Sequence, residues 1–527
     1  MKKVLISDTL AEEGIAILRN TPGIEVDVMT NLTHDELRAV IKDYDGLIIR
    51  SATKVTKEII DQADKLRVIG RAGIGLDNVD VQAASMRGIV VMNTPSGNTI
   101  TTGEHAIALM MSLARKIPQA TASMKEGKWE KNKFMGSEVF NKTLGIIGIG
   151  RVGTIVADRA QGIKMNVIAY DPFISPEAAE KLGVSLVSLP QLLETSDFIS
   201  VHTPLTKETR GIINAVAFAK MKQGVYIINC ARGGIISEKD LYEALMAGKV
   251  AGAALDVFEE EPTKNQALIS LENVICTPHL GASTDEAQIN VAIAIAEQVA
   301  AYLTQGEIKN AVNFPSVSAE LMTLIQPYLE LAEKLGKFEG QLITGAIQEV
   351  IVEYSGEILT YNVAPLTISL LKGLLTPILN ENINYINAPV VAKNRGIKVV
   401  EVKSSEVKDY TSMISVTVKT SREEISCAGA IFGRHDPRIV QLNKFPVEVI
   451  PEGHMIILSN YDRPGVIGNI GTTLGENGVN IARLHLSREQ LDKQALVVLT
   501  TDTPVSPEVQ EKLRNLPHVI ALQTLEM

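Results

Sequence analysis

The sequence predicts an α/β protein with two doubly wound parallel sheets, followed by an α+β segment and a ferredoxin-like domain. Three observations carry this prediction. Short apolar strands alternate with helices over about the first 95 residues, and the alternation restarts near residue 144 and continues to residue 277. From residue 455 onward the predicted order changes to strand, helix, two strands, helix and strand.

The chain of 527 residues is long enough for three or four domains of about 100–200 residues each. Its net charge of −10 argues against a nucleic-acid partner. The longest apolar stretches, residues 106–113 and 366–371, are too short to cross a bilayer. Residues 1–8 lack the apolar core of a signal peptide, and the three cysteines form no CxxC pair. We therefore expect a cytoplasmic protein with no membrane partner.

The first sheet is expected from five apolar segments of the length of buried parallel strands. They are residues 2–7, 25–29, 46–50, 66–70 and 88–92. Helices are predicted between them at residues 10–20 and 34–43, and a long helix after them at residues 103–116.

Six further apolar segments predict the second sheet, and six is the strand count of a doubly wound dinucleotide-binding sheet. They are residues 144–148, 166–170, 198–201, 225–229, 252–255 and 274–277. Another long amphipathic helix is predicted over residues 285–303.

The remainder of the chain divides into two segments with different patterns of predicted helices and strands. Residues 315–449 mix predicted helices at 320–335 and 366–379 with β-rich runs at 348–354 and 413–419. The last segment has the β-α-β-β-α-β order of a ferredoxin-like domain. Its predicted elements are residues 455–459, 465–476, 481–487, 494–500, 506–516 and 519–524.

The first strand of the second sheet leads into a glycine-rich turn that opens a predicted helix over residues 154–161. Gly148, Gly150 and Gly153 form a G-x-G-x-x-G pattern, and Asp171 follows about 20 residues later, after the next strand. In a dinucleotide site these glycines permit the tight turn, the approach of the pyrophosphate and the packing of helix on strand. Asp171 would accept hydrogen bonds from the ribose diol and repel a 2′-phosphate, which favours NAD over NADP.

A second glycine turn, at Gly73 and Gly75, also follows a predicted strand. No acidic residue stands at the spacing of a nucleotide site. Its backbone N–H groups could form a nest for a substrate carboxylate. On spacing alone, a tight turn at a strand end explains the pattern equally well.

Three polar residues follow separate strands of the second sheet, at the ends where ligands of such sheets bind. Arg232, Glu261 and His279 come after the fourth, fifth and sixth predicted strands. These residue types suit hydride transfer at an alcohol carbon. His279 can accept the hydroxyl proton, Glu261 can fix the histidine tautomer, and Arg232 can bind a substrate carboxylate.

The regions around these motifs resemble the signature regions of the D-2-hydroxyacid dehydrogenases. The resemblance rests on residues 148–153 with Asp171, and on residues 229–234, 253–262 and 278–283. Other segments resemble the phosphoglycerate-oxidising branch of that family, with its intervening and ACT regulatory domains. Those segments are residues 49–55, 71–80, 93–99, 127–136, 315–449, 462–465 and 478–481.

The resemblance implies a flavodoxin-like substrate-binding domain formed by residues 1–97 and 285–313. The NAD-binding domain, residues 98–284, would be inserted in it. An intervening domain over residues 315–450 and an ACT regulatory domain over residues 455–527 would follow.

The family's catalytic residues fall on Arg232, Glu261 and His279. Its NAD contacts fall on Ile74, Gly148, Gly150, Arg151, Val152, Gly153, Asp171, Thr203, Cys230, Ala231, Arg232, Asp256, His279, Leu280, Gly281 and Ala282. Asp256 would meet the nicotinamide carboxamide, and Ile74 replaces a threonine that many relatives carry. Its substrate contacts fall on Arg50, Ser51, Lys54, Gly73, Asn98 and Arg232.

The resemblance further implies NAD-dependent oxidation of 3-phospho-D-glycerate to 3-phosphohydroxypyruvate, the first step of L-serine biosynthesis. L-Serine would act as an effector, bound between two ACT domains through Asn460, Asp462 and Asn480. Such a site requires a homo-oligomer, and we expect a tetramer. No metal is implied.

Two other interpretations share the core motifs. A generic D-2-hydroxyacid dehydrogenase or glyoxylate/hydroxypyruvate reductase has the same glycine pattern and catalytic residues. An NADH-sensing binding protein, like the corepressors of this family, keeps them too. The tail after residue 315 argues against the first, and the ACT-like part of the tail and the segment 50–54 argue against the second.

Overall fold

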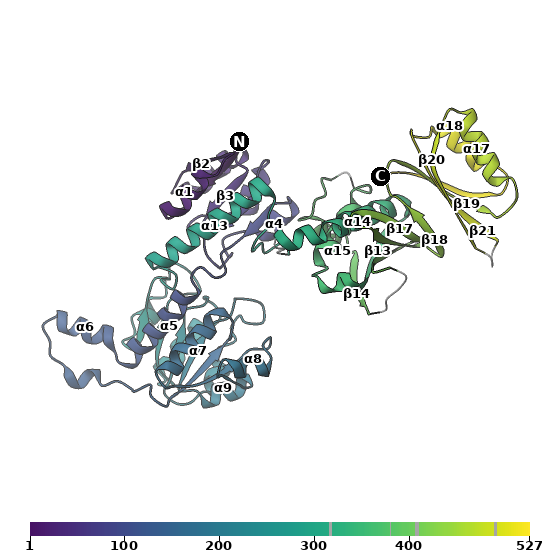
Figure 1. Cartoon of the computed structure of the whole chain (residues 1–527). Coiled ribbons are helices and arrows are strands. Elements are labelled where there is room, and N and C mark those ends of the chain that lie inside the picture. The colour runs from purple at the N-terminus through teal and green to yellow at the C-terminus, as the bar shows by residue number, and fades with distance from the viewer. Residues whose placement is uncertain (316–318, 380, 406–409, 490–492) are drawn as a thin grey trace.

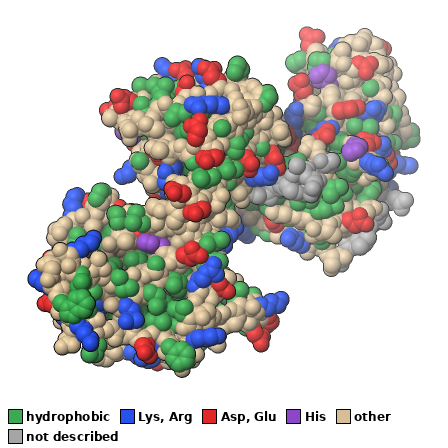
Figure 2. Space-filling view, turned by 60° about the vertical axis from the view of Figure 1, so that its left-hand side comes forward, with side chains coloured by type: hydrophobic (Ala, Val, Ile, Leu, Met, Phe, Trp, Pro, Cys, Tyr) green, Lys and Arg blue, Asp and Glu red, His purple; other side chains and the backbone are tan. Residues whose placement is uncertain are grey.

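The chain forms four lobes, each built on one sheet (Figure 1). This computed structural model describes residues 1–315, 319–379, 381–405, 410–489 and 493–527. The predicted fold class is confirmed, because two parallel α/β sheets are followed by a mixed sheet with helices and by a smaller ferredoxin-like sheet. Among these residues, none of the helices is both long and apolar enough to pass through a membrane. The face in Figure 2 carries Lys and Arg side chains interspersed with Asp and Glu.

The first lobe holds a five-stranded parallel sheet in the order β2-β1-β3-β4-β5. Helices cover both faces, so the central strands are buried on both sides. The strands are β1 (Lys2–Ile6), β2 (Ile24–Val28), β3 (Gly46–Ile49), β4 (Val68–Arg71) and β5 (Val90–Met92). The helices are α1 (Glu12–Asn20), α2 (His34–Val40), η1 (Ile41–Asp43), α3 (Lys57–Gln62), α4 (Val81–Met86) and α13 (Asp285–Gln305).

Helix α13 packs on this first sheet although the second lobe separates the two in the sequence. Val291 and Ile295 of α13 are buried in the same cluster as Val4 of β1. Beyond α13, the side chain of Asn313 bonds the backbone of the edge strand β5 at the Val91 N–H. The chain therefore leaves the first lobe after β5 and returns through α13, so the second lobe is inserted within the first.

The second lobe is a parallel sheet in the order β12-β11-β10-β9-β6-β7-β8. The strands are β6 (Thr143–Ile147), β7 (Asn166–Tyr170), β8 (Ser185–Leu186), β9 (Phe198–Val201), β10 (Val225–Asn229), β11 (Val250–Leu255) and β12 (Val274–Cys276). The helices are α5 (Thr99–Ala114), α6 (Ile117–Lys125), η2 (Lys131–Phe134), α7 (Arg151–Gly162), α8 (Pro176–Lys181), α9 (Leu189–Thr195), α10 (Ala215–Lys220), α11 (Glu238–Met246) and α12 (Gln266–Ile269).

The prediction of six strands in this sheet was one short. The seventh, β8, has two residues and lies at the sheet edge beside β7. So short a strand carries no alternation that a sequence pattern can reveal. Helices α5 and α7 also begin four and three residues earlier than predicted, at Thr99 instead of residue 103 and at Arg151 instead of residue 154.

The third lobe is a six-stranded sheet in the order β14-β13-β15-β16-β17-β18, with β13 and β14 parallel and the other neighbours antiparallel. The predicted helix over residues 320–335 continues to Leu342, because Phe338 and Leu342 are also buried in this core. The elements are α14 (Ala319–Leu342), β13 (Ile347–Gly356), η3 (Glu357–Thr360), α15 (Ala364–Leu375), α16 (Ala388–Asn394), β14 (Lys398–Ser404), β15 (Ser412–Thr420), β16 (Glu424–Phe432), β17 (Asp436–Leu442) and β18 (Phe445–Val449).

The fourth lobe has the predicted β-α-β-β-α-β order around an antiparallel sheet, β20-β21-β19-β22. The alternation of β19 buries both of its faces. Ile456 and Leu458 pack with the two helices, whereas Met455 and Ile457 join the core of the third lobe. The elements are β19 (His454–Tyr461), α17 (Val466–Glu476), β20 (Ile481–Glu489), β21 (Gln494–Thr501), α18 (Pro507–Arg514) and β22 (Val519–Glu526).

Candidate active site

The glycine-rich turn after β6 meets the requirements that its sequence pattern predicts. Gly148 has a φ of 93°, and a Cβ there would lie 2.8 Å from the His202 carbonyl oxygen. A Cβ on Gly153 would overlap the Gly148 carbonyl oxygen. At Gly150, by contrast, no described atom lies within 4 Å of the Cβ position. The turn is therefore tightly packed inside and open at Gly150, where a ligand can approach the backbone.

Helix α7 begins at Arg151, and no described side chain caps its first N–H groups. These groups and the positive end of the helix face the open side of the turn, an arrangement that suits a phosphate. Asp171 lies beside the turn at the end of β7. Its carboxylate accepts hydrogen bonds from the backbone N–H of Ile149 at 3.0 Å and of Phe173 at 2.9 Å.

One further polar atom at this turn lacks a protein partner. The Thr203 Oγ1 is buried without a hydrogen bond within the described part of the chain. Its Cγ2 lies 2.7 Å from the Cβ position of Gly148, so the free hydroxyl is next to the turn. An orphaned hydroxyl, uncapped helix N–H groups and an open glycine fit a dinucleotide, with Asp171 at the ribose.

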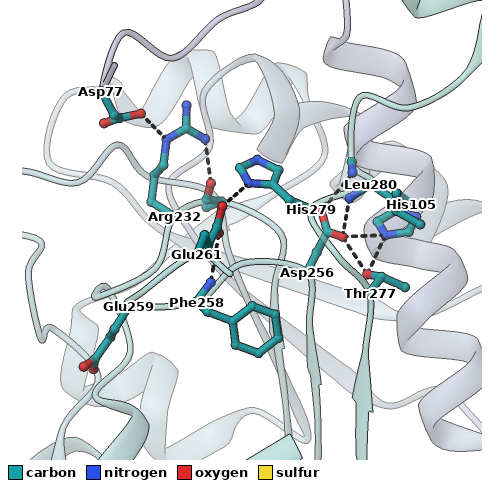
Figure 3. Close-up of polar contacts among 12 residues, drawn as sticks. Asp77, His105, Arg232, Asp256, Phe258, Glu259, Glu261, Thr277, His279 and Leu280 are labelled. Carbon is teal, nitrogen blue, oxygen red and sulfur yellow. Dashed lines mark hydrogen bonds and ion pairs between the residues drawn. The ribbon is translucent and has the colours of Figure 1, made fainter. Parts of the chain in front are cut away.

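His279 and Glu261 form a hydrogen-bonded pair beyond the ends of β12 and β11 (Figure 3). The His279 Nδ1 lies 2.7 Å from the Glu261 Oε2, and the Glu261 Oε1 accepts a bond from the Phe258 N–H at 3.1 Å. Burial opposes ionisation of Glu261, but the hydrogen bonds from His279 and Phe258 outweigh it and lower its pKa.

The tautomer of His279 follows from this contact. A carboxylate can only accept a hydrogen bond, so Nδ1 carries the hydrogen and Nε2 of the neutral ring has a free lone pair. Nε2 has no hydrogen-bond partner among the residues described, and the side chain is half exposed. The pair therefore presents a base to the solvent-filled side of the site.

Arg232 lies next to this pair, in the loop after β10 (Figure 3). The Asn229 side chain shapes the loop by bonding the Ala231 N–H and the Arg232 carbonyl. The guanidinium donates through Nη1 to the Ala231 carbonyl at 2.7 Å and through Nε to Asp77 of the first lobe at 3.1 Å. The site is thus shared by the first two lobes.

Asp256, predicted to meet a nicotinamide carboxamide, is fully buried beneath the loop that carries His279. It accepts bonds from Thr277 Oγ1 at 2.6 Å and from the N–H groups of Leu280 and Gly281 at 2.6 and 2.8 Å. His105 Nε2 lies 3.2 Å away. Burial opposes its ionisation, but these donors lower the pKa of Asp256. Asp256 therefore braces the loop, and its contact with a carboxamide stays a prediction.

The sequence interpretation did not include His105 or Arg71 among the site residues. His105 projects from the middle of α5, where no local pattern marks it. Arg71 is the last residue of β4 and is largely buried, and its Nε has no partner among the described residues. Burial, and next the charge of Arg232, lower the pKa of Arg71 to about 10. Its position at the carboxyl end of a parallel strand was the signal that could have found it.

The other predicted substrate residues lie in the loops after β3 and β4 and just before α5. Arg50 donates to the Thr9 carbonyl at 3.1 Å, and Ser51 and Lys54 are exposed. Asn98 has a buried Oδ1 without a partner in the described chain. Gly73 has a φ of 148° beside the Arg71 guanidinium, and Ile74, whose carbonyl is held by Asn93, is partly exposed.

The remaining predicted cofactor residues line the loops at the carboxyl ends of this sheet. Cys230 is buried and Gly281 is also buried, whereas Val152, Ala231 and Ala282 are partly exposed. Leu280 is exposed, as is Arg151 at the start of α7. Burial raises the pKa of the Cys230 thiol, so this cysteine is not a reactive thiolate.

The three predicted effector residues lie in the fourth lobe, far along the chain from this site. Asn460 is buried in β19, where its amide donates to the Tyr461 carbonyl and its Oδ1 has no partner within the described residues. Asp462 pairs with Arg488. Asn480 is exposed and donates to Asp502 at 2.7 Å.

Comparison with known proteins matches three parts of the chain to family models. Residues 107–281 match the NAD-binding domain of the D-isomer-specific 2-hydroxyacid dehydrogenases. Residues 324–443 match the intervening domain of D-3-phosphoglycerate dehydrogenase, and residues 454–518 match the ACT domain. The match to the ACT domain agrees with the ferredoxin-like order of the fourth lobe.

Two full-length relatives are D-3-phosphoglycerate dehydrogenases. That of Archaeoglobus fulgidus is 47% identical, and that of Bacillus subtilis is 40% identical, with 100% of both chains covered in each case. The chain belongs to the D-3-phosphoglycerate dehydrogenase family. This dehydrogenase is therefore an oxidoreductase of the D-2-hydroxyacid type, as the sequence motifs predicted, and its second lobe is the family's NAD-binding domain.

Solved structures of shorter enzymes match a smaller part of this dehydrogenase. The glyoxylate reductase of Paecilomyes thermophila aligns with a TM-score of 0.55 at 29% identity, over 59% of this chain and 98% of that one. The D-lactate dehydrogenase of Aquifex aeolicus, in complex with NAD and lactic acid, aligns with a TM-score of 0.53 at 27% identity, over 59% and 100%. The full-length relatives match the tail as well, so the tail separates the chain from the short reductases, as predicted.

Proposed function

We propose that this enzyme oxidises 3-phospho-D-glycerate to 3-phosphohydroxypyruvate with NAD, the first step of L-serine biosynthesis. The observation that carries the proposal is the His279–Glu261 pair beside Arg232, with Arg50 and Arg71 close enough for their charges to act on one another. A general base next to a cluster of arginines suits an alcohol that carries two anionic groups. The names of the full-length relatives support the same substrate.

The arginines would divide the two anionic ends of the substrate. Arg232, closest to the base, would bind the carboxylate next to the reacting carbon and polarise its oxygen. Arg50 and Arg71, at the ends of β3 and β4, would bind the phosphate, with Ser51, Lys54 and Asn98 nearby. Burial lowers the pKa of Arg50, and it lowers that of Arg71 to about 10, so both guanidinium groups stay charged at neutral pH and gain from an anionic partner.

The chemical step would use the free lone pair of His279. Its Nε2 would accept the proton of the substrate hydroxyl, while Glu261 stabilises the imidazolium that forms. When bound, NAD would supply the acceptor for the hydride of the carbon that bears this hydroxyl, and the product would be the ketone. Gly150 and the first N–H groups of α7 would hold the pyrophosphate, Asp171 the ribose, and Thr203 a polar edge of the cofactor.

The ACT domain would make the enzyme sensitive to its pathway's end product. We expect L-serine to bind where two fourth lobes meet in a homo-oligomer, through Asn460, Asp462 and Asn480. The unpaired Oδ1 of Asn460 and the exposed amide of Asn480 are polar groups that an amino acid could use. Inhibition then requires different serine affinities in the active and inactive states.

The direct test is NADH formation by the purified full chain from 3-phospho-D-glycerate and NAD. D-Glycerate, which lacks the phosphate, is the matched substrate. Arg71→Ala should lower kcat/KM for phosphoglycerate about 100-fold and for D-glycerate much less, since a lost charge-assisted contact is worth roughly 1.5–3 kcal/mol. Arg87→Ala, at an exposed ion pair with Asp64, is the control. An equal loss with both substrates would contradict the phosphate assignment.

A further inference from the structure

One contact of the site belongs to no step described so far. Asp77, in the loop after β4, meets the Arg232 guanidinium on the side away from Glu261 and His279 (Figure 3). Its Oδ2 lies 3.1 Å from the Arg232 Nε. The two residues come from different lobes, and the Asp77 side chain is 69% exposed. An exposed carboxylate thus binds the arginine side chain that the proposed mechanism uses.

The loop of Asp77 is shaped around this guanidinium. A Cβ on Gly75 would overlap the Arg232 Nη2, so glycine at this position lets the guanidinium lie where it does. With Nε on Asp77 and Nη1 on the Ala231 carbonyl, Nη2 has no acceptor within the described part of the protein. Hydrogen bonds therefore fix the guanidinium at Nε and Nη1 and leave Nη2 available.

The charges explain why a tether is needed. Arg71 and Arg232 carry like charges close enough to act on each other, and Asp77 is the carboxylate whose charge acts most strongly on Arg71 in the opposite sense. Without Asp77, mutual repulsion would favour orientations in which the partly exposed Arg232 side chain turns outward to water.

We propose that Asp77 is a positioning residue of the reaction: it holds the Arg232 guanidinium by Nε against repulsion from Arg71 and leaves Nη2 for the substrate. The inference rests on the proposed catalytic role of Arg232. It has a clear rival, in which Asp77 merely occupies Arg232 in place of the substrate carboxylate. The two hypotheses predict opposite effects of removing Asp77, because removal of a tether slows turnover, whereas removal of a competitor improves substrate binding.

The test is the kinetics of Asp77→Asn, which keeps an oxygen acceptor but loses the charge. We expect kcat to fall about tenfold while KM changes less than threefold, because a misplaced guanidinium fails mainly in the transition state. Asp64→Asn, which removes an exposed carboxylate near the opposite end of β4, is the control and should leave both unchanged. An unchanged kcat, or a lower KM with higher kcat/KM, would overturn the proposal.

A double-mutant cycle separates positioning from a general loss of structure. In an Arg232→Lys background, Asp77→Asn should cost nothing further, since its effect passes through the guanidinium. An equal tenfold cost in both backgrounds would overturn the inference. Wild-type turnover by Arg232→Lys would overturn the catalytic assignment itself. Low turnover by Arg232→Lys with wild-type turnover by Asp77→Asn would overturn the Asp77 proposal alone. Asp77→Ser serves as a second variant if the asparagine fails to fold.

Discussion

The Nδ1 of His279 lies 2.7 Å from the Oε2 of Glu261, and this contact fixes which ring nitrogen can act as a base. Because Nδ1 donates, Nε2 must accept the substrate proton. His279→Ala should therefore lower turnover about 10²–10⁴-fold, as expected for the loss of a general base. The measurement is NADH formation under saturating substrates, with thermal unfolding as a check on folding. Turnover within threefold of wild type would contradict the assignment.

The pH dependence of the same pair has a definite sign. Hydrogen bonds lower the pKa of Glu261 despite its partial burial, so its carboxylate is charged throughout the neutral range. Its negative charge is lost only as pH falls through that lowered pKa, below 4.5. Protonation of Glu261 therefore does not limit the oxidation rate near neutrality.

Glu261→Gln should lower the oxidation rate across the neutral range, because the imidazolium that forms loses its counter-charge. The plateau rate at high pH should also fall, since the amide no longer stabilises the cation that forms. Glu260→Gln, an exposed neighbour paired with Lys264, is the matched control. The kcat/KM profiles of the three proteins between about pH 5 and pH 9 provide the comparison. An unchanged oxidation rate for Glu261→Gln would show that the carboxylate does not act on the histidine.

Asp171 accepts hydrogen bonds from the N–H of Ile149 in the glycine turn and from that of Phe173 after β7, and its expected partner in the cofactor is the ribose. Asp171→Ala should raise the KM for NAD about tenfold, since it removes the ribose acceptor and loosens the turn. The KM for NADP should rise less or fall, because the charge that repels a 2′-phosphate is also removed. Asp158→Ala, on the exposed face of α7, controls for net charge. An unchanged ratio of the KM for NAD to the KM for NADP would exclude Asp171 as the ribose ligand.

Much of the fold could be predicted because its determinants are local. The glycine turn at Gly148 is set by backbone sterics within one segment, and the tail by six regular elements in order. The misses were elements held by distant contacts. Strand β8 exists through two residues of edge pairing with β7, and α14 extends past residue 335 because Phe338 and Leu342 meet a core formed by strands far along the chain.

The candidate site divides in the same way. Arg232, Glu261 and His279 could be proposed because the ends of parallel strands converge, a rule that needs only the strand order. His105 reaches Asp256 from a helix 151 residues away in sequence, and no spacing marks such a contact. Asp77 meets Arg232 across two lobes, so it depends on their packing and not on a motif.

The effector proposal makes Asn480 the most accessible residue to test. Asn480 lies just before β20, and its exposed amide donates a hydrogen bond to Asp502. Asn480→Ala should weaken inhibition by L-serine at least tenfold while leaving turnover without serine unchanged, because the fourth lobe lies outside the catalytic site. Asn515→Ala, at the exposed C-cap of α18, is the control. Activity against serine concentration gives the comparison, and equal inhibition of both variants would remove Asn480 from the site.

Glu339 of α14 is fully buried in the third lobe, beside Cys427 of β16. Burial raises the pKa of Glu339 well above its ordinary value, and it raises that of the Cys427 thiol as well. The folded chain thus keeps a proton that the unfolded chain releases above about pH 4.5. Between that pH and the raised pKa the unfolded state holds fewer protons, so the free energy of unfolding falls as pH rises.

Glu339→Gln should remove this dependence, since the amide has nearly the same shape and does not titrate. Relative to wild type, the variant should gain stability, measured as the free energy of unfolding, as pH rises from about 5 to about 8.5. At the lower pH both proteins bury a neutral side chain, so the difference there should be small. Glu330→Gln, on the exposed side of the same helix, should show no such gain. Thermal unfolding of the full chain at the two pH values provides the measurement. A difference that stays constant between them, or that turns against the variant at high pH, would show that Glu339 is not held as the neutral acid.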